Sequence, residues 1–274
     1  MDRGVRGESL SASRGQQGLV FGEVASLYDR SRPSYPDEIF EEIEGFAGSG
    51  PGPRVLEIGA GTGKATQQMA RRGWSVLALE PSAPMARLAR ANLASSPMVR
   101  VVEAHFEAWD PMDEAFSVVC AAQSWHWVDP VVGFPKAARV MRQDGALALI
   151  WNCALGGDDE IRKELDRVYH SFAPGISSTP PSERQGDRGL AISSSGLFGP
   201  VTRIRVPWTL AYSGRTYTEL MSTQSDHRLL EVVVLDRLLA KVEEVIENRG
   251  GFYRVDYVTL VYLARRLPDG QRFG

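Results

Sequence analysis

Three closely spaced glycines and one carboxylate are the residues in this sequence that indicate chemistry most clearly. Gly59, Gly61 and Gly63 follow the apolar run 55–58 and precede a helical pattern. Because glycine has no Cβ, this spacing suits a tight strand-to-helix turn and lets a ligand approach the main chain closely. Glu80 ends the next apolar strand, where a carboxylate can accept hydrogen bonds from both hydroxyls of a ribose. The pattern indicates a site for an adenosine-containing ligand.

The spacing of the glycines distinguishes between cofactors. A dinucleotide fingerprint requires G-x-G-x-x-G, so that a pyrophosphate can lie at the helix N-terminus. Here the third glycine comes one residue early, and Lys64 stands at the expected place. This weakens the interpretation as a nicotinamide-dependent oxidoreductase, which stays open as an alternative. An ordinary glycine-rich turn without a ligand is the simplest alternative.

The motif E-x-G-x-G-x-G at 57–63, followed by an acidic residue at the end of the second strand, resembles that of class I S-adenosylmethionine-dependent methyltransferases. The resemblance is to their broad small-molecule branch, the methyltransferase type 11-like proteins, and it covers about residues 20–152. It implies an α/β, Rossmann-like fold with a mostly parallel seven-stranded sheet, helices on both faces and a helical cap or insertion over the pocket. It also implies S-adenosyl-L-methionine as cofactor and S-adenosyl-L-homocysteine as product.

Two loops after later strands extend the resemblance. The segment 103–109 follows the strand 99–102 and resembles the adenine-binding loop of the family, with His105 in place of the usual Asp. The amide of Phe106 is then the expected donor to the adenine ring. The segment 122–128 is close to the A-x-S-x-H-W motif of one subgroup.

The N-terminal part matches the same subgroup through Phe21, Tyr28, Asp29 and the segment 32–36. There the resemblance implies that an aromatic residue and an arginine close over the cofactor, and Arg32 could pair with the methionyl carboxylate. The residues expected to bind the cofactor are Tyr28, Arg32, Glu57, Gly59, Ala60, Gly61, Thr62, Gly63, Glu80, Pro81, Met85, His105, Phe106, Glu107 and Gln123.

The implied reaction is an SN2 transfer from a methyl sulfonium, which needs alignment and exclusion of water more than a dedicated base. His126 is the best placed candidate for a general base, since it follows a strand and its ordinary pKa of about 6.5 suits neutral pH. Alternatively, His126 only holds its loop by a hydrogen bond. Tyr28 is the second candidate, with a binding role favoured over proton transfer. His170 and His227 are more typical of partly exposed helix residues.

The elements that would position these residues alternate regularly along the chain, after a helix that begins near Pro36. They are strand 54–58, helix 64–72, strand 75–80, helix 84–94, strand 99–103, strand 116–121, helix 131–141 and strand 146–152. Such alternation predicts a parallel sheet with helices on both faces and a ligand site at the carboxyl ends of the strands.

Beyond residue 152 the regular alternation stops. The expected elements are a helix at 158–172, a flexible lid or disordered excursion at 174–189, a strand at 201–210, a helical pattern at 227–248 and a terminal strand at 252–263. We expect a mobile tail at 1–18 and a single domain at 19–274. Its parts are a cofactor-binding core at 19–152, substrate-side helices and lid at 153–250 and a terminal strand at 251–264. Substrate choice is expected to depend on residues 153–235.

Composition limits the remaining possibilities. A formal charge of −3 provides no basic field for a phosphate backbone, so nucleic acid is an unexpected partner. Cys120 and Cys153 fall in apolar strands, which favours buried thiols in a reduced, cytoplasmic chain, with no disulfide and no metal site. No apolar run reaches the roughly 18 residues that span a membrane. The chain is expected to be a monomer or homodimer.

The acceptor is expected to be a small molecule with an oxygen, nitrogen or carbon nucleophile. Tryptophan and tyrosine residues in the second half of the chain allow an aromatic or indole-like acceptor, plausible in specialised metabolite biosynthesis. A binding module that keeps the cofactor without transferring the methyl group is a further alternative.

Overall fold

The computed structural model describes residues 25–48, 52–111, 115–176, 188–268 and 270. The tail expected at 1–18, Phe21 and most of the lid expected at 174–189 lie outside these ranges. Within them, seven strands form one sheet in the order β3-β2-β1-β4-β5-β7-β6. The strands are β1 (Arg54–Ile58), β2 (Ser75–Glu80), β3 (Val99–Glu103), β4 (Phe116–Ala122), β5 (Met141–Gly157), β6 (Thr202–Ser213) and β7 (Phe252–Arg265).

The first five strands pair in parallel, whereas β7 runs antiparallel to both β5 and β6. Central β4 is buried along its whole length, as expected for a strand with helices on both faces. The order reverses between β1 and β4, which opens a crevice at the carboxyl edge of the sheet. The predicted mostly parallel α/β fold is confirmed.

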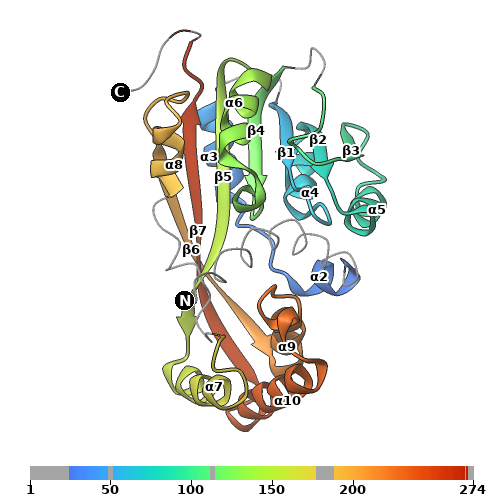
Figure 1. Cartoon of the computed structure of the whole chain (residues 1–274), viewed down its shortest axis with the longest axis vertical. Helices are drawn as coiled ribbons and strands as arrows, with labels where there is room; N and C mark the ends of the chain where they lie inside the picture. Colours follow the sequence, from blue (N-terminus) through green and yellow to red (C-terminus); the bar gives the residue numbers. More distant parts are fainter. Residues whose placement is uncertain (1–24, 49–51, 112–114, 177–187, 269, 271–274) are drawn as a thin grey trace, which may run out of the picture.

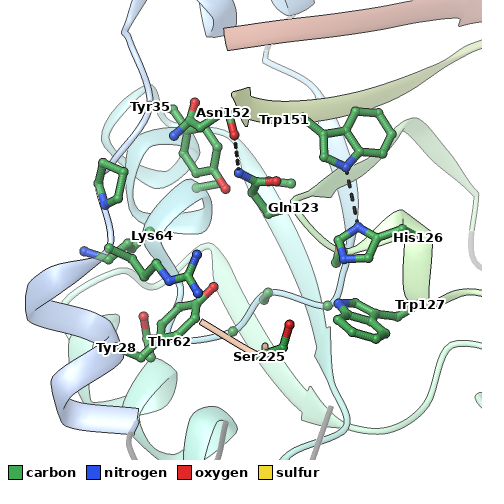
Figure 2. Close-up of a pocket in the computed structure, with 18 of the residues that line it drawn as sticks. Tyr28, Tyr35, Thr62, Lys64, Gln123, His126, Trp127, Trp151, Asn152 and Ser225 are labelled. Atoms are coloured by element: carbon green, nitrogen blue, oxygen red, sulfur yellow. Dashed lines mark hydrogen bonds between the residues drawn. The ribbon is translucent and has the colours of Figure 1, made fainter. Parts of the chain in front are cut away.

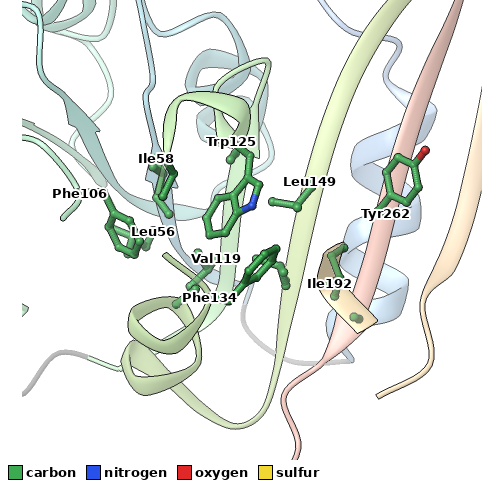
Figure 3. Packing of buried hydrophobic residues seen from close by; sticks show 14 of the residues in the cluster. Leu56, Ile58, Phe106, Val119, Trp125, Phe134, Leu149, Ile192 and Tyr262 are labelled. Carbon is green, nitrogen blue, oxygen red and sulfur yellow. The ribbon is translucent and has the colours of Figure 1, made fainter. Parts of the chain in front are cut away.

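Helices cover both faces of the sheet (Figure 1). They are α3 (Glu38–Ala47), α4 (Lys64–Arg71), α5 (Ala83–Asn92), α6 (Pro130–Val140) and α8 (Arg188–Ser194). On one face, Phe40 and Met69 from α3 and α4 pack against the strands. On the other, Phe134 from α6 and Ile192 from α8 pack with Trp125 and Leu149 (Figure 3). The two hydrophobic layers hold the strand ends that build the site.

A second group of helices lies beyond the carboxyl edge of the sheet, at the far ends of the long strands β5, β6 and β7 (Figure 1). We call α7 (Asp159–Phe172), α9 (Gly214–Ser222) and α10 (Val232–Asn248) the helical cap. Leu165, Leu220 and Leu238 from these three helices share a buried cluster with Tyr253 and Tyr257 of β7. The short α2 (Ala25–Ser31) contacts α9 of the cap and α5 of the core.

Most predicted boundaries agree with the structure within two residues, but the long strands differ. β5 begins at Met141 and continues to Gly157, well beyond the predicted 146–152, because it stays paired with β7 past the edge of the parallel strands. The register of this pair shifts between Ala154 and Gly156, which indicates a β-bulge. The extended β5 and β7 thus carry the helical cap.

The predicted continuous helix at 227–248 is wrong at its start. A 3₁₀ turn η4 (His227–Leu229) precedes α10, and extended backbone at Leu230 and Glu231 separates the two. Leu229, in this 3₁₀ turn, is 71% exposed and does not belong to the core. No helix within the described ranges is long and apolar enough to cross a membrane.

Candidate active site

A cavity of about 470 Å³ opens between the carboxyl edge of the sheet and the helical cap. Every residue predicted to bind the cofactor lines it, with the exception of Gly63. Both predicted catalytic residues, His126 and Tyr28, also line it. Residues distant in sequence therefore meet in one cavity, as predicted from the ends of parallel strands.

The three glycines of the loop have left-handed backbone conformations, but they face different surroundings. A Cβ at Gly59 (φ +68°) would lie 2.5 Å from the Cβ of Ser124, and one at Gly63 (φ +87°) would lie 2.9 Å from Leu93 Cδ1. A Cβ at Gly61 (φ +60°) would meet no atom within 4 Å. Packing therefore requires glycine at both positions, and Gly63 faces Leu93 and Ala89 rather than the cavity. Gly61 presents its main chain to open space.

Glu80 is fixed beside this loop at the end of β2. Its Oε2 accepts a hydrogen bond from the Gly61 N–H and its Oε1 accepts one from the Ser82 N–H, both at 2.8 Å. Burial raises the pKa of this carboxyl, and the two N–H donors and nearby His105 oppose that rise. Each carboxylate oxygen has a further lone pair, so Glu80 can still accept bonds from two hydroxyls.

Glu57 lies deeper, at the end of β1, and its side chain is almost fully buried. Burial raises its pKa to about 8, a rise that the hydrogen bond from Thr66 Oγ1 to Glu57 Oε2 (2.5 Å) partly offsets. The Glu80 carboxylate adds a smaller upward contribution. Glu57 is therefore a buried carboxyl that holds its proton at neutral pH in the absence of a bound cation.

The predicted adenine loop is anchored to the core by its apolar residue. Phe106 is buried against Trp125, while His105 is exposed on the cavity side. The carboxylate of Glu107 accepts a hydrogen bond from the Asp129 N–H at 3.1 Å. The Phe106 N–H donates to no acceptor in the described part of the chain, so it can serve the predicted bond to the adenine ring.

Arg32 is held from the cap side of the cavity. Its Nε donates to Thr223 Oγ1 at 2.9 Å and its Nη2 donates to the Thr223 carbonyl at 2.8 Å. Its guanidinium lies 5.1 Å from the ring centre of Tyr28. Arg32 thus joins the N-terminal segment to the residue after α9, and its pairing with the cofactor carboxylate stays a prediction.

His126 lies in the 3₁₀ turn η2 (Trp125–Trp127), exposed to the cavity, with its ring beside that of Trp127 (Figure 2). Trp151 Nε1 donates to His126 Nδ1 at 3.5 Å. Such a donor favours the neutral tautomer that carries its proton on Nε2, which is a poorer base toward a substrate. This contact favours the alternative that His126 holds its loop.

Sequence reasoning did not assign a site role to Asn152, which follows Trp151 at the edge of the sheet. The main-chain carbonyl of Asn152 accepts from Gln123 Nε2 at 2.8 Å (Figure 2). The side-chain Nδ2 of Asn152 donates to the Ser34 carbonyl at 2.9 Å. Gln123 itself has a left-handed conformation, with φ +59°, that is uncommon for a side chain of this kind. Its position at the end of the strand predicted at 146–152, comparable to that of Gln123 after β4, is the signal that could have identified Asn152.

Further lining residues come from the helical cap and the segment after α9, from the start of α8, and from β5 and β7. They are Trp151, Cys153, Ala154, Gly156, Arg162, Arg188, Tyr217, Leu220, Met221, Gln224, Ser225, Tyr253, Val255 and Tyr257. In the sequence the apolar and aromatic residues of this set are typical of ordinary core positions, and the polar ones are typical of solvent-facing positions. Tyr35 and Lys64 also line the cavity without having been predicted to bind the cofactor.

The cofactor end of the cavity fits S-adenosylmethionine. Thr62 Oγ1 is buried without a hydrogen-bond partner among the described residues, beside the open space at Gly61. An unpaired buried hydroxyl is costly, and a bound polar ligand would satisfy it. Glu80 supplies acceptors for a ribose, and Phe106 supplies a donor for a purine. These groups would hold an adenosyl moiety.

Comparison with known proteins agrees with this geometry. Residues 56–149 match the family described as methyltransferase domain. The uncharacterized methyltransferase Rv3342 of Mycobacterium tuberculosis is 29% identical over 93% of this chain and 96% of its own length. The uncharacterized methyltransferase C25B8.09 of Schizosaccharomyces pombe is 23% identical over 92% of this chain and 98% of its own.

A solved structure from Anaeromyxobacter dehalogenans, assigned to the type II methyltransferases, has the same fold. Its TM-score is 0.63 at 22% identity, covering 86% of this chain and 99% of that one. Because the relatives are methyltransferases, the nicotinamide-dependent alternative is not retained. The chain is a class I S-adenosylmethionine-dependent methyltransferase.

Proposed function

We propose that this methyltransferase acts on a small-molecule acceptor with an aromatic or otherwise apolar body, through an oxygen, nitrogen or carbon nucleophile. One observation carries the proposal: the residues of the cofactor end and those of the helical cap line the same cavity. The cap contributes Tyr217, Leu220 and Met221, which are apolar or aromatic and largely buried. Such walls suit a small organic molecule.

The cofactor, when bound, supplies an electrophilic methyl group on a sulfonium. The chain must therefore hold donor and acceptor in line, and such positioning is worth about 7–11 kcal/mol in favourable cases. Glu80 and the main chain at Gly61 would fix the adenosyl end. Gln123 and Asn152, hydrogen-bonded to each other, would form the rigid floor between the two halves of the cavity.

The walls of the acceptor half would exclude water from the reacting atoms. Trp151 packs edge-on against Tyr262, and Tyr217 packs edge-on against Tyr253, so these rings are held by neighbours. Tyr28, whose ring lies beside the Arg32 guanidinium, would form an aromatic wall next to the methyl group. His126 is the candidate base for an acceptor that must lose a proton, and a carbon acceptor on an electron-rich ring would need little base help.

We further propose that the chain works in the cytoplasm in specialised metabolite biosynthesis, as one domain with its core at 19–152 and its substrate side at 153–250. The two cysteines, Cys120 and Cys153, are free and buried, which is consistent with a reducing compartment. The cavity-lining residues from Cys153 to Ser225 lie in the segment 153–235 that is predicted to determine substrate choice, whereas Trp151, Asn152, Tyr253, Val255 and Tyr257 lie outside it.

The test begins with calorimetric titration of S-adenosylhomocysteine, followed by labelled-methyl transfer to pooled phenols, indoles, amines and carboxylates. Micromolar binding with transfer into one pool supports the proposal. Tight binding with no transfer to any pool favours the non-catalytic binding module. Absence of binding contradicts the assigned cofactor end.

Glu80→Ala tests the cofactor end directly. We expect it to weaken S-adenosylhomocysteine binding by about 1.5–3 kcal/mol, the usual contribution of hydrogen bonds to a charged group. Glu103→Ala is the matched control, because Glu103 is paired in register with Glu80 on β3 but is exposed and outside the cavity. An unchanged dissociation constant for Glu80→Ala would remove this residue from the ribose.

A further inference from the structure

The segment that carries the expected donor to adenine forms one helical turn, which we call the adenine turn (residues 105–109). The His105 carbonyl accepts from the Ala108 N–H at 3.1 Å and from the Trp109 N–H at 2.9 Å. The Phe106 N–H lies at the start of this turn, where the first N–H groups have no partner within the turn. The direction in which this N–H meets a ligand therefore depends on how the whole turn is held.

Lys136 of α6 holds the other end of the adenine turn from outside the cavity. Its Nζ donates to the Glu107 carbonyl at 3.0 Å and to the Trp109 carbonyl. A lysine in such a place satisfies the last carbonyls of a helical turn. The ammonium also lies 5.4 Å from the ring centre of Phe106 and 5.9 Å from that of Trp109, a cation–π geometry. One side chain thus contacts the turn through two carbonyls and two rings.

The N-terminal part of α6 contacts the same turn. Asp129, the N-cap residue of α6, donates its N–H to Glu107 Oε1 at 3.1 Å. Phe106 packs against Trp125, whose ring centre is 5.0 Å from that of Phe134 on α6 (Figure 3). Helix α6 and the adenine turn are therefore packed as one unit, and the position of the helix determines the position of the turn.

The residue before Phe106 makes this main-chain donor more important. The resemblance described above implies an Asp where this chain has His105, which is exposed on the cavity side. A carboxylate offers two acceptor oxygens to the amino group of adenine, whereas a neutral imidazole offers one acceptor nitrogen. Recognition of the purine then depends more on the Phe106 N–H than it does where an Asp is present.

We infer that Lys136 is a positioning residue for the adenine ring of the cofactor, holding the adenine turn so that the Phe106 N–H meets the purine nitrogen N1. This inference rests on the proposed function, because it assumes that the adenosyl moiety binds at the cofactor end. N1 of adenine is an acceptor and fits this donor, whereas N1 of hypoxanthine carries a hydrogen and would oppose it. A donor left without an acceptor in a closed site is unfavourable. Lys136 therefore contributes to selectivity for adenine.

The test compares two ligands that differ at the purine. S-adenosylhomocysteine has an acceptor at N1, and S-inosylhomocysteine has an N1–H. Each is titrated calorimetrically into the full chain, and we expect S-adenosylhomocysteine to bind about tenfold or more tightly, because the other ligand leaves the donor unpaired. Equal affinities would overturn the inference, since the Phe106 N–H would then not contact the ring nitrogen. Binding of neither ligand would contradict the proposed function itself, and the inference with it.

Lys136→Met tests the lysine. Methionine keeps an unbranched stem beside the two rings but cannot donate to the carbonyls of the adenine turn. We expect the affinity for S-adenosylhomocysteine to fall about tenfold and that for S-inosylhomocysteine to change by less than about threefold, so the preference is lost. Lys136→Arg keeps donors for both carbonyls and should keep the preference. Lys163→Met is the matched control, because Lys163 is exposed on α7, pairs with Glu160 and lies outside the cavity.

The ratio of the two affinities separates positioning from a structural role. A general loss of stability would lower both affinities by the same factor, whereas a displaced Phe106 N–H lowers the affinity for the adenine ligand alone. An equal fall in both affinities for Lys136→Met, or an unchanged preference, overturns the role of Lys136. Should this variant fail to fold, Lys136→Gln keeps a shorter, neutral donor, and an undiminished preference for adenine in that variant would overturn the inference as well.

Discussion

The two halves of the cavity are built in different ways. The cofactor end consists of short loops at the carboxyl ends of parallel strands, where main-chain groups and the Glu80 carboxylate would make the proposed contacts to the cofactor. The acceptor end consists of side chains from the helical cap and from β5 and β7, which extend beyond the sheet. The first construction requires particular residues at fixed spacing, such as Gly61 and Glu80. The second requires only apolar and aromatic surface, in which Arg162 and Arg188 are the distinctive groups.

The largest expected effect tests whether the boundary between the halves contains a base. His126→Asn should lower the rate of methyl transfer by about 100-fold or more if His126 removes a proton. S-adenosylhomocysteine binding should not change. Trp151→Phe removes the N–H that contacts His126 Nδ1 but keeps an aromatic wall, and it should cost less than tenfold. Undiminished turnover of His126→Asn, measured with the identified acceptor, would leave His126 only the role of holding its loop.

The glycine loop separates packing from ligand contact within the cofactor end. Gly59→Ala should lower the free energy of unfolding by about 3 kcal/mol, because its Cβ would clash with Ser124 in a left-handed conformation. Gly61→Ala should cost only about 1 kcal/mol, since its Cβ would enter open space. S-adenosylhomocysteine affinity should nevertheless fall about tenfold or more for Gly61→Ala. Denaturant unfolding and calorimetry together check both; equal stability of the two variants would contradict the difference in packing.

The buried carboxyl of Glu57 predicts a pH dependence for the cofactor-free protein. Its pKa is about 8 in the folded chain and near 4.5 when exposed, so the folded state binds the extra proton between these values. Stability should therefore decrease as the pH rises from 5 to 8 and then level off. Glu57→Gln keeps an oxygen acceptor for Thr66 without a titrating charge. It should be more stable than the unmodified chain by about 2 kcal/mol at pH 8 and nearly equal at pH 5. Denaturant unfolding of both proteins measures this difference. If the difference in unfolding free energy between Glu57→Gln and the unmodified chain is the same at pH 5 and pH 8, the raised pKa of Glu57 is contradicted.

The features that could be predicted from the sequence belong mostly to the cofactor end of the molecule, and those that could not belong mostly to the acceptor end. The order and type of elements up to 152 were predictable because strands with helices on both faces are continuously apolar and are separated by glycine turns. The residues that line the cavity at those strand ends were predicted from their positions after the strands together with the resemblance to the methyltransferase family. The length of β5 could not be predicted, since its extension depends on pairing with β7, more than 100 residues later. The place of Arg162 and Arg188 in the cavity lining could not be predicted either, because an arginine on an amphipathic helix is usually a solvent-facing residue.

The smallest expected effect concerns the residue that joins the two halves. Arg32 was predicted to hold the cofactor carboxylate, yet its Nε and Nη2 donate to Thr223 at the end of α9. Thr223→Val removes the hydroxyl that accepts from Arg32 and donates to the Leu220 carbonyl, so unfolding free energy should fall by about 1 kcal/mol. S-adenosylhomocysteine affinity should stay the same, because the main-chain acceptor still holds the guanidinium.

Arg32→Lys provides the contrast to this variant. Lysine keeps the charge but lacks the planar fork, so it cannot serve Thr223 and a carboxylate at the same time. We expect it to weaken S-adenosylhomocysteine binding about tenfold, whereas Thr223→Val leaves that affinity unchanged. If both variants weaken binding equally, Arg32 acts by holding the helical cap in place rather than by contacting the cofactor. The cofactor end would then depend on the cap for its closure, and the two halves of the cavity could not be varied independently.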